Sequence, residues 1–289
     1  MTKTLSGLQV TTMIRKNYDI YSIFEAPQEL YFGDEKEVNV NIVEKVRVWT
    51  PEGEKEKCYI SPTKRRGVER RCLLWSDAKG RLLMDKLECG IPNTCCKDTC
   101  PVCIVFGGLI PGEKTFIGRL THSGGVAVSA QILLEKQRAM HPALLYKEKE
   151  DTPMPYRKEY AQPALLYPIS NHCISISEDD FSTVAYAFLM SLNRLGAGNP
   201  KGVSFARTAW DGTSELEPLL VVDEYRAPMG ERPIISPSIT DNNVAVEMFK
   251  KLAKTYRANE PKFTRLVGSA ALERLQNAAK AFEEKHLCA

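Results

Sequence analysis

The sequence predicts an α+β fold with a largely antiparallel sheet, and three observations indicate this class. Strand-like and helix-like segments are mixed along the 289 residues without the regular alternation of a βαβ protein. Residues 38–48 carry apolar side chains at alternate positions in two short runs, which is the period of a half-buried strand. The segment after Ser177 has the start signal and the apolar face of an amphipathic helix.

The N-terminal third is expected to contain strands and then an irregular segment. Residues 8–24 and 37–50 predict strands with polar connections. Residues 51–88 hold prolines and glycines among many charged residues, and we interpret them as a loop-rich excursion. After the cysteines that follow, residues 118–134 predict a strand, a glycine turn and a second strand.

The second half begins with an expected insertion and continues with the clearest helix of the chain. Residues 140–168 contain five prolines and predict a long exposed loop or an inserted subdomain. Residues 171–177 then predict a short strand. Ser177 and Asp180 form a capping box, and the helix that they start is expected to end at Gly196. Its apolar face comprises Phe181, Val184, Ala185, Phe188, Leu189, Leu192 and Leu195.

Three more elements are expected before the C-terminus. Residues 216–228 predict a buried strand with a charged end. Asp241 then occupies the N-cap position of a second amphipathic helix, which stops before Pro261. This helix is expected to face the core with Val244, Met248, Leu252 and Tyr256. Residues 264–287 predict a last helix, so that residues 241–289 form a C-terminal helical region.

Composition indicates a soluble globular protein. Hydrophobic residues make up 43% of the chain and charged residues 26%. No apolar run approaches the roughly 18 residues that span a bilayer, and the N-terminus lacks the features of a signal peptide. We therefore expect a cytoplasmic protein without a membrane partner. It is interpreted as a single domain, residues 1–289, with insertions at 51–105 and 140–168.

Five of the nine cysteines lie in the stretch CGIPNTCCKDTCPVC, residues 89–103. In a reducing cytosol such a cluster indicates metal ligands rather than disulfides. Two donor arms can form a closed Cys₄ zinc site with a structural role. The expected ligands are Cys89, Cys96, Cys100 and Cys103, with Cys95 as the alternative to its neighbour Cys96. Reduced cysteines packed as small apolar residues and a redox C-x-x-C pair are the weaker interpretations.

Basic residues are concentrated between Lys64 and Lys86, where eight basic side chains face three acidic ones. Such a run is either a solvated surface or a patch that binds a polyanion. A glycine-rich loop with Lys201, flanked by Arg194 and Arg207, could let a nucleic-acid backbone approach closely.

Catalytic motifs are not evident. The four histidines fit no metal-protease or nucleophile-elbow pattern. His122 is the exception, because it stands at a glycine turn beside Arg119. The sequence identifies no partner that would make it a general base.

Two segments carry a resemblance to a known family. Residues 99–130, TCPVCIVFGGLIPGEKTFIGRLTHSGGVAVSA, and residues 188–212, FLMSLNRLGAGNPKGVSFARTAWDG, resemble the Cas-seven family of the RAMP superfamily. The likeness is to backbone subunits of type I-D CRISPR surveillance complexes. The order of the basic excursion, the cysteines and the C-terminal helices extends it to most of the chain.

The resemblance implies an RRM-like (ferredoxin-like) core with inserted finger and thumb regions. It implies copies that polymerise along a CRISPR guide RNA and present it to a target strand, together with other subunits of a Cascade-like antiviral complex. We expect the following residues to lie at the RNA: Lys64, Arg65, Arg66, Arg70, Arg71, Arg119, His122, Lys201 and Arg207.

The resemblance does not imply an enzyme here. Some superfamily members cut target RNA with an aspartate near the end of the strand after the cysteines, and this chain has His122 close to that place. Asp98 and Glu113 leave nuclease activity open. The alternative hypotheses are an RNA-processing ribonuclease that uses His122 and a zinc-bound protein–protein adaptor.

Overall fold

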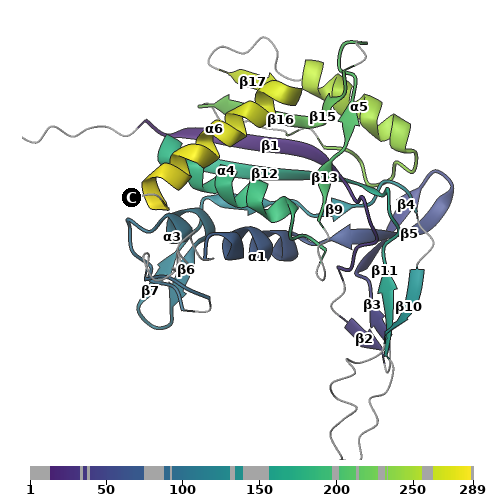
Figure 1. Ribbon diagram of the computed structural model, residues 1–289, viewed down its shortest axis with the longest axis horizontal. Helices are drawn as coiled ribbons and strands as arrows, with labels where there is room; N and C mark the ends of the chain where they lie inside the picture. Colours follow the sequence, from purple (N-terminus) through teal and green to yellow (C-terminus); the bar gives the residue numbers. More distant parts are fainter. Residues whose placement is uncertain are drawn as a thin grey trace, which may run out of the picture.

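The computed structural model describes most of the chain, and the helices and strands below all lie in the described parts (Figure 1). The described residues are 14–32, 35–37, 40–74, 88–91, 93–130, 134–138, 156–196, 202–212, 215–226, 232, 234–255 and 263–287. Among these residues no helix combines the length and the apolar composition that a bilayer span requires.

A central antiparallel sheet organises the molecule. Its strand order is β17-β16-β1-β12-β8, and each neighbouring pair is antiparallel. The strands are β1 (Lys16–Glu25), β8 (Leu120–His122), β12 (Leu166–Ile176), β16 (Leu220–Tyr225) and β17 (Thr264–Val267). The short strand β13 (Ser204–Phe205) also pairs with β1.

Four helices build the main core on one face of this sheet. They are α1 (Pro62–Cys72), α3 (Pro101–Phe106), α4 (Glu178–Leu192) and α6 (Gly268–His286). Tyr18 of β1 stacks on Phe181 of α4 with ring centroids 4.1 Å apart, and Phe24 packs against Phe188. Alternate residues of β1 therefore bury their side chains beneath α4, as the strand period requires.

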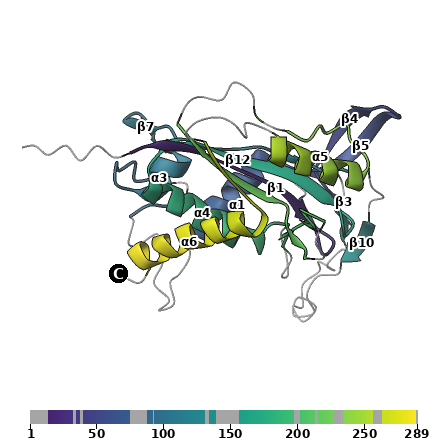
Figure 2. The ribbon, with the colours of Figure 1, turned by 90° about the horizontal axis from the view of Figure 1, so that it is seen from above.

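Helix α5 (Asn242–Thr255) covers the other face (Figure 2). A second core lies there, to which the sheet contributes Tyr21, Ile23 and Val221. Phe249 of α5 packs into this core. Both faces of the central sheet are thus covered, and the two sets of side chains come from alternate positions of the same strands.

Smaller sheets surround the core. Strands β10 (Leu134–Arg138), β11 (Tyr156–Tyr160), β3 (Val40–Ile42) and β2 (Glu35–Glu37) form one sheet in that order. Strands β4 (Lys45–Thr50) and β5 (Gly53–Ile60) form a hairpin, and β5 pairs with β9 (Gly125–Val126). Two further hairpins join β6 (Gly108–Ile110) to β7 (Lys114–Phe116) and β14 (Arg207–Thr208) to β15 (Glu217–Pro218).

The expected loop-rich excursion at residues 51–88 is wrong for its first part, which forms β5 and α1. Ser61 stands at the N-cap position of α1 and Pro62 fills the first turn, where a missing N–H has no cost. Arg65 and Glu69 share the buried face of the helix, four residues apart. The sequence did not predict this helix because its buried face carries charged residues. Apolar residues therefore do not recur at the helical period.

Other expected elements match in type but differ in extent. The capping box of Ser177 and Asp180 is confirmed, with Asp180 N donating to Ser177 Oγ at 3.1 Å. The expected insertion at residues 140–168 contains β11 and the start of β12, and residues 140–155 lie outside the described residues. Residues 264–267 are a strand rather than the first turn of the last helix.

The second amphipathic helix faces the core with a different set of residues than expected. Asp241 caps it as predicted, since its Oδ1 accepts from the backbone N–H of residues 243 and 244. However, Val244 is 51% exposed and Met248 is 37% exposed. Ala245, Phe249 and Ala253 are the buried positions, so the predicted inner face is displaced by one residue at these two sites. Leu252 is half-buried, and Tyr256 lies outside the described residues.

Candidate metal centre and nucleic-acid interface

Four cysteines converge beside α3. The Sγ atoms of Cys89, Cys95, Cys100 and Cys103 all lie within 4.8 Å of one another. Cys103 Sγ is 3.7 Å from Cys89 Sγ and 3.8 Å from Cys95 Sγ. Four thiolates about 2.3 Å from one zinc ion would lie about 3.8 Å apart in a tetrahedron. The spacing of the thiols therefore fits a closed Cys₄ centre.

Cys95, and not the expected Cys96, belongs to this cluster. Cys96 has φ +47°, a left-handed conformation that turns the chain sharply between the two neighbouring side chains. Its Sγ atom contacts Thr94 Oγ1 at 3.3 Å, away from the four converging sulfurs. The prediction of Cys96 as a ligand is thus corrected to Cys95, the alternative that the sequence left open.

The backbone around the cluster is held by local hydrogen bonds. Cys100 is the N-cap residue of α3 and its N–H donates to Lys97 O at 3.1 Å. Gly90 N donates to Asn93 O at 2.8 Å, and Lys97 forms an ion pair with Glu88. Two tight turns therefore deliver the cysteine arms to one point.

The pKa values of the clustered cysteine thiols differ. A hydrogen bond from the Cys100 thiol, together with contacts from the other cysteines, lowers the pKa of Cys89 to about 5. Burial and the neighbouring Cys89 together raise the pKa of Cys103 to about 12. Without an ion the cluster thus favours one thiolate, whereas a bound divalent cation would favour four.

Helix α3 ties the cysteine cluster to the main core. Val102, Val105 and Phe106 are buried between α1 and α4. Gly107 ends α3 with φ +80°, and a Cβ there would lie 2.7 Å from the carbonyl oxygen of Phe116. The β6–β7 hairpin leaves the core at this close crossing, so the four cysteines can fix both the helix and the base of the hairpin.

Arg65, a predicted phosphate contact, is buried in the core. Its side chain is 0% exposed. It donates to the carbonyls of Ser123 at 2.8 Å and Ser170 at 3.0 Å, contacts Asn171 Oδ1, and lies 3.5 Å from Glu69. The guanidinium therefore joins α1 to the sheet, and the prediction that Arg65 binds RNA is wrong for this conformation.

His122 is also buried, with its side chain 1% exposed. Its Nε2 lies 2.7 Å from Glu69 Oε2, and its ring stacks on Phe106. Asn171 donates to the same carboxylate at 3.1 Å. The expectation that His122 lies at the RNA is corrected, because a phosphate cannot reach a ring enclosed in this way.

Lys64, Arg66 and Arg119 are partly or fully exposed but have intramolecular partners. Lys64 Nζ lies 2.7 Å from Glu44 Oε2. Arg66 donates to the carbonyl oxygen of Phe106. Arg119 donates to the carbonyl oxygen of Ser175 at 2.8 Å. Phosphate contact stays a prediction for these three.

The other predicted basic residues divide into three groups. Arg70 is half-buried, and its Nε and Nη2 atoms have no hydrogen-bond partner. Arg71 is exposed on the last turn of α1, and Arg207 is exposed on β14. Lys201 lies outside the described residues. Of the nine residues expected at the RNA, Arg66, Arg71 and Arg207 are thus the cations whose exposure fits the prediction best.

Sequence analysis missed an aromatic residue on the surface. Trp49 is 76% exposed near the end of the β4–β5 hairpin, where it stands opposite Glu54. Arg47, on the same strand, is exposed as well. Figure 1 shows this hairpin projecting from the body of the molecule. The signal was the alternation in KVRVWT, whose outward positions carry arginine and tryptophan.

Comparison of the chain with known proteins finds similarity in fold only. No protein-family model matches the chain, and no curated protein matches it. The crystal structure of Thermofilum pendens Csc2 is similar with a TM-score of 0.50 and 13% identity, covering 99% of this chain and 90% of Csc2. Because the identity is low, this likeness shows a shared fold.

Two chains of larger assemblies are similar over most of their length. A chain of a type IV-B CRISPR complex has a TM-score of 0.44 and 14% identity, covering 78% of this chain and 96% of that one. A chain of a CRISPR RNA-guided surveillance complex has a TM-score of 0.49 and 12% identity, covering 92% and 100%.

Proposed function

We propose that this protein is a guide-RNA-binding backbone subunit of a CRISPR effector complex in antiviral defence. The fold that it shares with Csc2 along almost the whole of both chains carries the proposal. Residues 99–130 and 188–212 add the resemblance to the Cas-seven family of type I-D complexes. Its partners would be the guide RNA, a target strand, copies of itself and other subunits of the complex.

The topology supports an RRM-like core for this role. The elements β1, α1, β8, β12, α4 and β16 follow one another in the chain, and the sheet places these strands in the order β16-β1-β12-β8. A βαββαβ unit with its first and third strands at the centre is the ferredoxin-like arrangement. Here α3, β4 and β5 are inserted between β1 and β8, together with the cysteine cluster.

Exposed side chains on the inserted β4–β5 hairpin, on α1 and on β14 would contact the RNA. Trp49 offers a flat apolar surface on which a base can stack, and such stacking tolerates any sequence. Arg66, Arg71 and Arg207 offer phosphate contacts, which add affinity without base specificity. Guide pairing would then supply the specificity of the complex.

A structural zinc ion would complete the insertion. Cys89, Cys95, Cys100 and Cys103 would hold it, and their spacing fits a tetrahedral centre. Four thiolates leave no position for a reactive water, so the ion would stabilise α3 and its hairpin without a part in catalysis. We propose no nuclease activity for the chain, in keeping with the enclosed ring of His122.

RNA binding by the full chain tests the proposal. A labelled single-stranded RNA with a CRISPR repeat sequence is titrated at several salt concentrations, and anisotropy reports the Kd. Affinity should fall steeply with salt. Arg71→Glu should weaken binding and reduce the slope of log K against log salt by about 0.7 per lost phosphate contact. Lys280→Glu, an exposed cation on α6, is the matched control.

A second pair of variants tests the stacking surface. Trp49→Ala should weaken binding by about 1–3 kcal/mol, the range for one stacked base. Ile117→Ala is its control, because Ile117 is 84% exposed directly after β7. A folded protein that binds no RNA at low salt, and that purifies free of nucleic acid, would overturn the proposal and favour the adaptor hypothesis.

A further inference from the structure

Three side chains on the sheet face covered by α5 form a continuous hydrogen-bonded chain. Ser170 Oγ lies 2.9 Å from His172 Nε2, and His172 Nδ1 lies 2.9 Å from Asp19 Oδ1. Ser170 and His172 are two residues apart on β12 and therefore point to the same face. Asp19 stands directly opposite His172 on β1. The register of one strand pair thus creates a serine–histidine–aspartate array.

The aspartate of this array is held rigidly. Asp19 is 0% exposed, and its Oδ2 accepts from the hydroxyls of Tyr21 at 3.0 Å and Tyr225 at 3.1 Å. Arg232 Nε lies 3.5 Å from the same oxygen. Burial and the neighbouring carboxylate raise the pKa of Tyr21 well above its usual value, and burial does the same for Tyr225. Both hydroxyls therefore remain donors to Asp19.

These contacts fix the tautomer of His172. Oδ2 of Asp19 receives the tyrosine hydrogens, so its Oδ1 is an acceptor for the imidazole. The hydrogen between His172 and Asp19 then lies on Nδ1, which leaves Nε2 of the neutral ring as an acceptor. In this neutral tautomer Ser170 donates its hydroxyl hydrogen to Nε2. The ring is therefore placed to take that proton when Ser170 attacks an electrophile.

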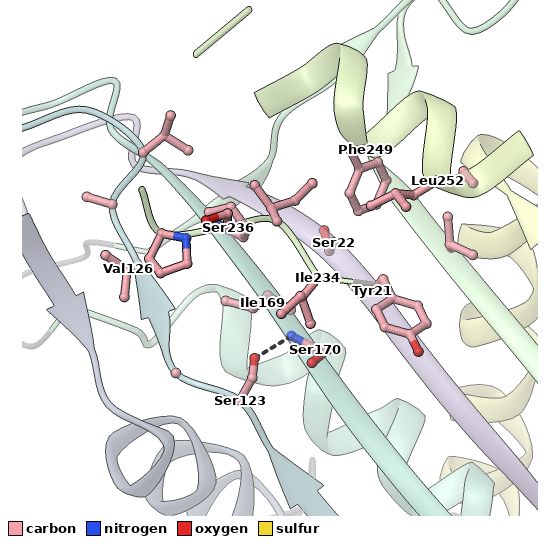
Figure 3. A pocket seen from close by; sticks show the side chains of 18 of the residues that line it. Tyr21, Ser22, Ser123, Val126, Ile169, Ser170, Ile234, Ser236, Phe249 and Leu252 are labelled. Atoms are coloured by element: carbon pink, nitrogen blue, oxygen red, sulfur yellow. Dashed lines mark hydrogen bonds between the residues drawn. The ribbon is translucent and has the colours of Figure 1, made fainter. Parts of the chain in front are cut away.

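A cavity of about 290 Å³ opens beside this serine. Ser170 contributes to its lining, and Figure 3 shows the residue among apolar side chains from the sheet, from α5 and from residues 234–237. The apolar lining includes Val126, Ile169, Ile234 and Phe249. The space suits a small, largely apolar molecule rather than a charged one.

We propose that Ser170 is a nucleophile that accepts acyl groups from small apolar carboxylic esters in this cavity. His172 activates Ser170, and Asp19 orients His172. Ser170 Oγ forms a bond to the ester carbonyl carbon while its proton passes to His172 Nε2. The bond to the leaving alkoxide breaks, and the alkoxide takes that proton. Water, deprotonated by the same Nε2, then attacks the acyl-serine and releases the acid and free Ser170. This activity goes beyond the proposed RNA-binding role and does not depend on it.

A purely structural array would not show this reactivity. Asp19 already has hydrogen-bond donors in Tyr21 and Tyr225 and an ion pair with Arg232, so its burial does not require a serine at the far end of the imidazole. If Ser170 served only as the hydrogen-bond partner of His172, its hydroxyl would be unreactive. The two cases differ in whether replacement of His172 changes the rate at which Ser170 reacts.

The test uses the full chain with a fluorophosphonate probe, which modifies activated serines. The modified residue is located by peptide mass spectrometry, and hydrolysis of p-nitrophenyl butyrate is followed in parallel. We expect labelling at Ser170, its loss in Ser170→Ala, and normal labelling in Ser204→Ala, which removes an exposed hydroxyl on β13 outside the cavity. His172→Phe keeps an aromatic ring against Tyr21 and should slow labelling on the order of 100-fold or more.

Two results would overturn the proposal. One is wild-type protein, folded by circular dichroism, that takes up no probe and hydrolyses no ester. The other is labelling of Ser170 at the same rate in folded His172→Phe, since general-base activation would then be absent. Neither result bears on RNA affinity, so failure here is separable from failure of the proposed function.

Discussion

The Sγ atom of Cys95 lies 3.8 Å from that of Cys103, although Cys95 and Cys96 are adjacent in the sequence and only one can face the cluster. Cys96 is buried and Cys95 only half-buried, but the Cys96 thiol contacts Thr94 Oγ1 and lies against Gly108. Greater burial therefore does not identify the member of the cluster, whereas the left-handed turn at Cys96 separates the two side chains. This relationship makes the identity of the fourth ligand testable.

Cys95→Ser should remove zinc from the protein, whereas Cys96→Ser should not. Loss of one thiolate opens a closed Cys₄ site, and ligand loss lowers the affinity of such sites strongly. Zinc per chain, measured by elemental analysis, should be about one equivalent in the wild type and in Cys96→Ser. Equal zinc loss in both variants would contradict the assignment, and a wild type free of metal would reject the centre altogether.

Arg65→Met should destabilise the protein by about 3 kcal/mol, the scale for breaking a buried charged pair. Burial lowers the pKa of Arg65 to about 10, so the guanidinium remains charged at neutral pH. Its removal takes one hydrogen-bond donor from each of two backbone carbonyls and from Glu69. Thermal unfolding measures the loss as a fall in Tm. Arg71→Met, on the exposed side of the same helix, should change stability by about 0.5 kcal/mol or less. Equal effects would contradict the buried role.

Arg65 also shows the limit of sequence reasoning at the candidate site. Sequence identifies a cluster of arginines but not which face of a helix enters the core, because Arg65 and Glu69 can satisfy each other and the sheet. The cysteines were predictable as a group, since their ligand spacing is local. The pairing of Asp19 with His172 was not, because a strand register between residues 153 positions apart creates it.

Glu69→Gln should reduce the dependence of protein stability on pH in the acidic range. Burial alone would raise the pKa of Glu69, but contacts with His122, Arg65 and Asn171 outweigh it and hold the pKa below the usual 4.5. A carboxylate with a lowered folded-state pKa stabilises the protein above its unfolded-state pKa, and this contribution is lost as the pH falls through the folded-state pKa. The Tm advantage of the wild type over the variant should therefore be full near pH 6 and shrink below about pH 4.5.

Glu284→Gln is the control for this measurement. Glu284 is exposed on α6, where its only described ion pair is a 3.9 Å contact with Lys280. Its Tm difference from the wild type should stay small across the same pH range. A constant Tm difference for Glu69→Gln from pH 6 to pH 3 would show that the network is held by packing and not by the charge of Glu69.

The fold was more accessible to sequence analysis than the site, and α5 shows why. Its capping residue Asp241 leaves a local signal, as does the box of Ser177 and Asp180 on α4. Which side of α5 faces the sheet depends on where the helix lies. Val244 and Met248 form as good an apolar stripe in the sequence as Ala245 and Phe249, and only the packing against the sheet decides between them.

Phe249→Ala should therefore destabilise the protein by about 3 kcal/mol or more, the usual cost of deleting a buried aromatic ring. Phe249 packs against Trp210 with ring centroids 6.1 Å apart and lines the cavity beside Ser170. Met248→Ala, one position away and 37% exposed, should cost less than about 1 kcal/mol. Thermal unfolding of the two variants compares the neighbouring faces of one helix directly. If Met248→Ala were the more damaging change, α5 would be rotated about its axis, and the cavity proposed for ester binding would lose one of its walls.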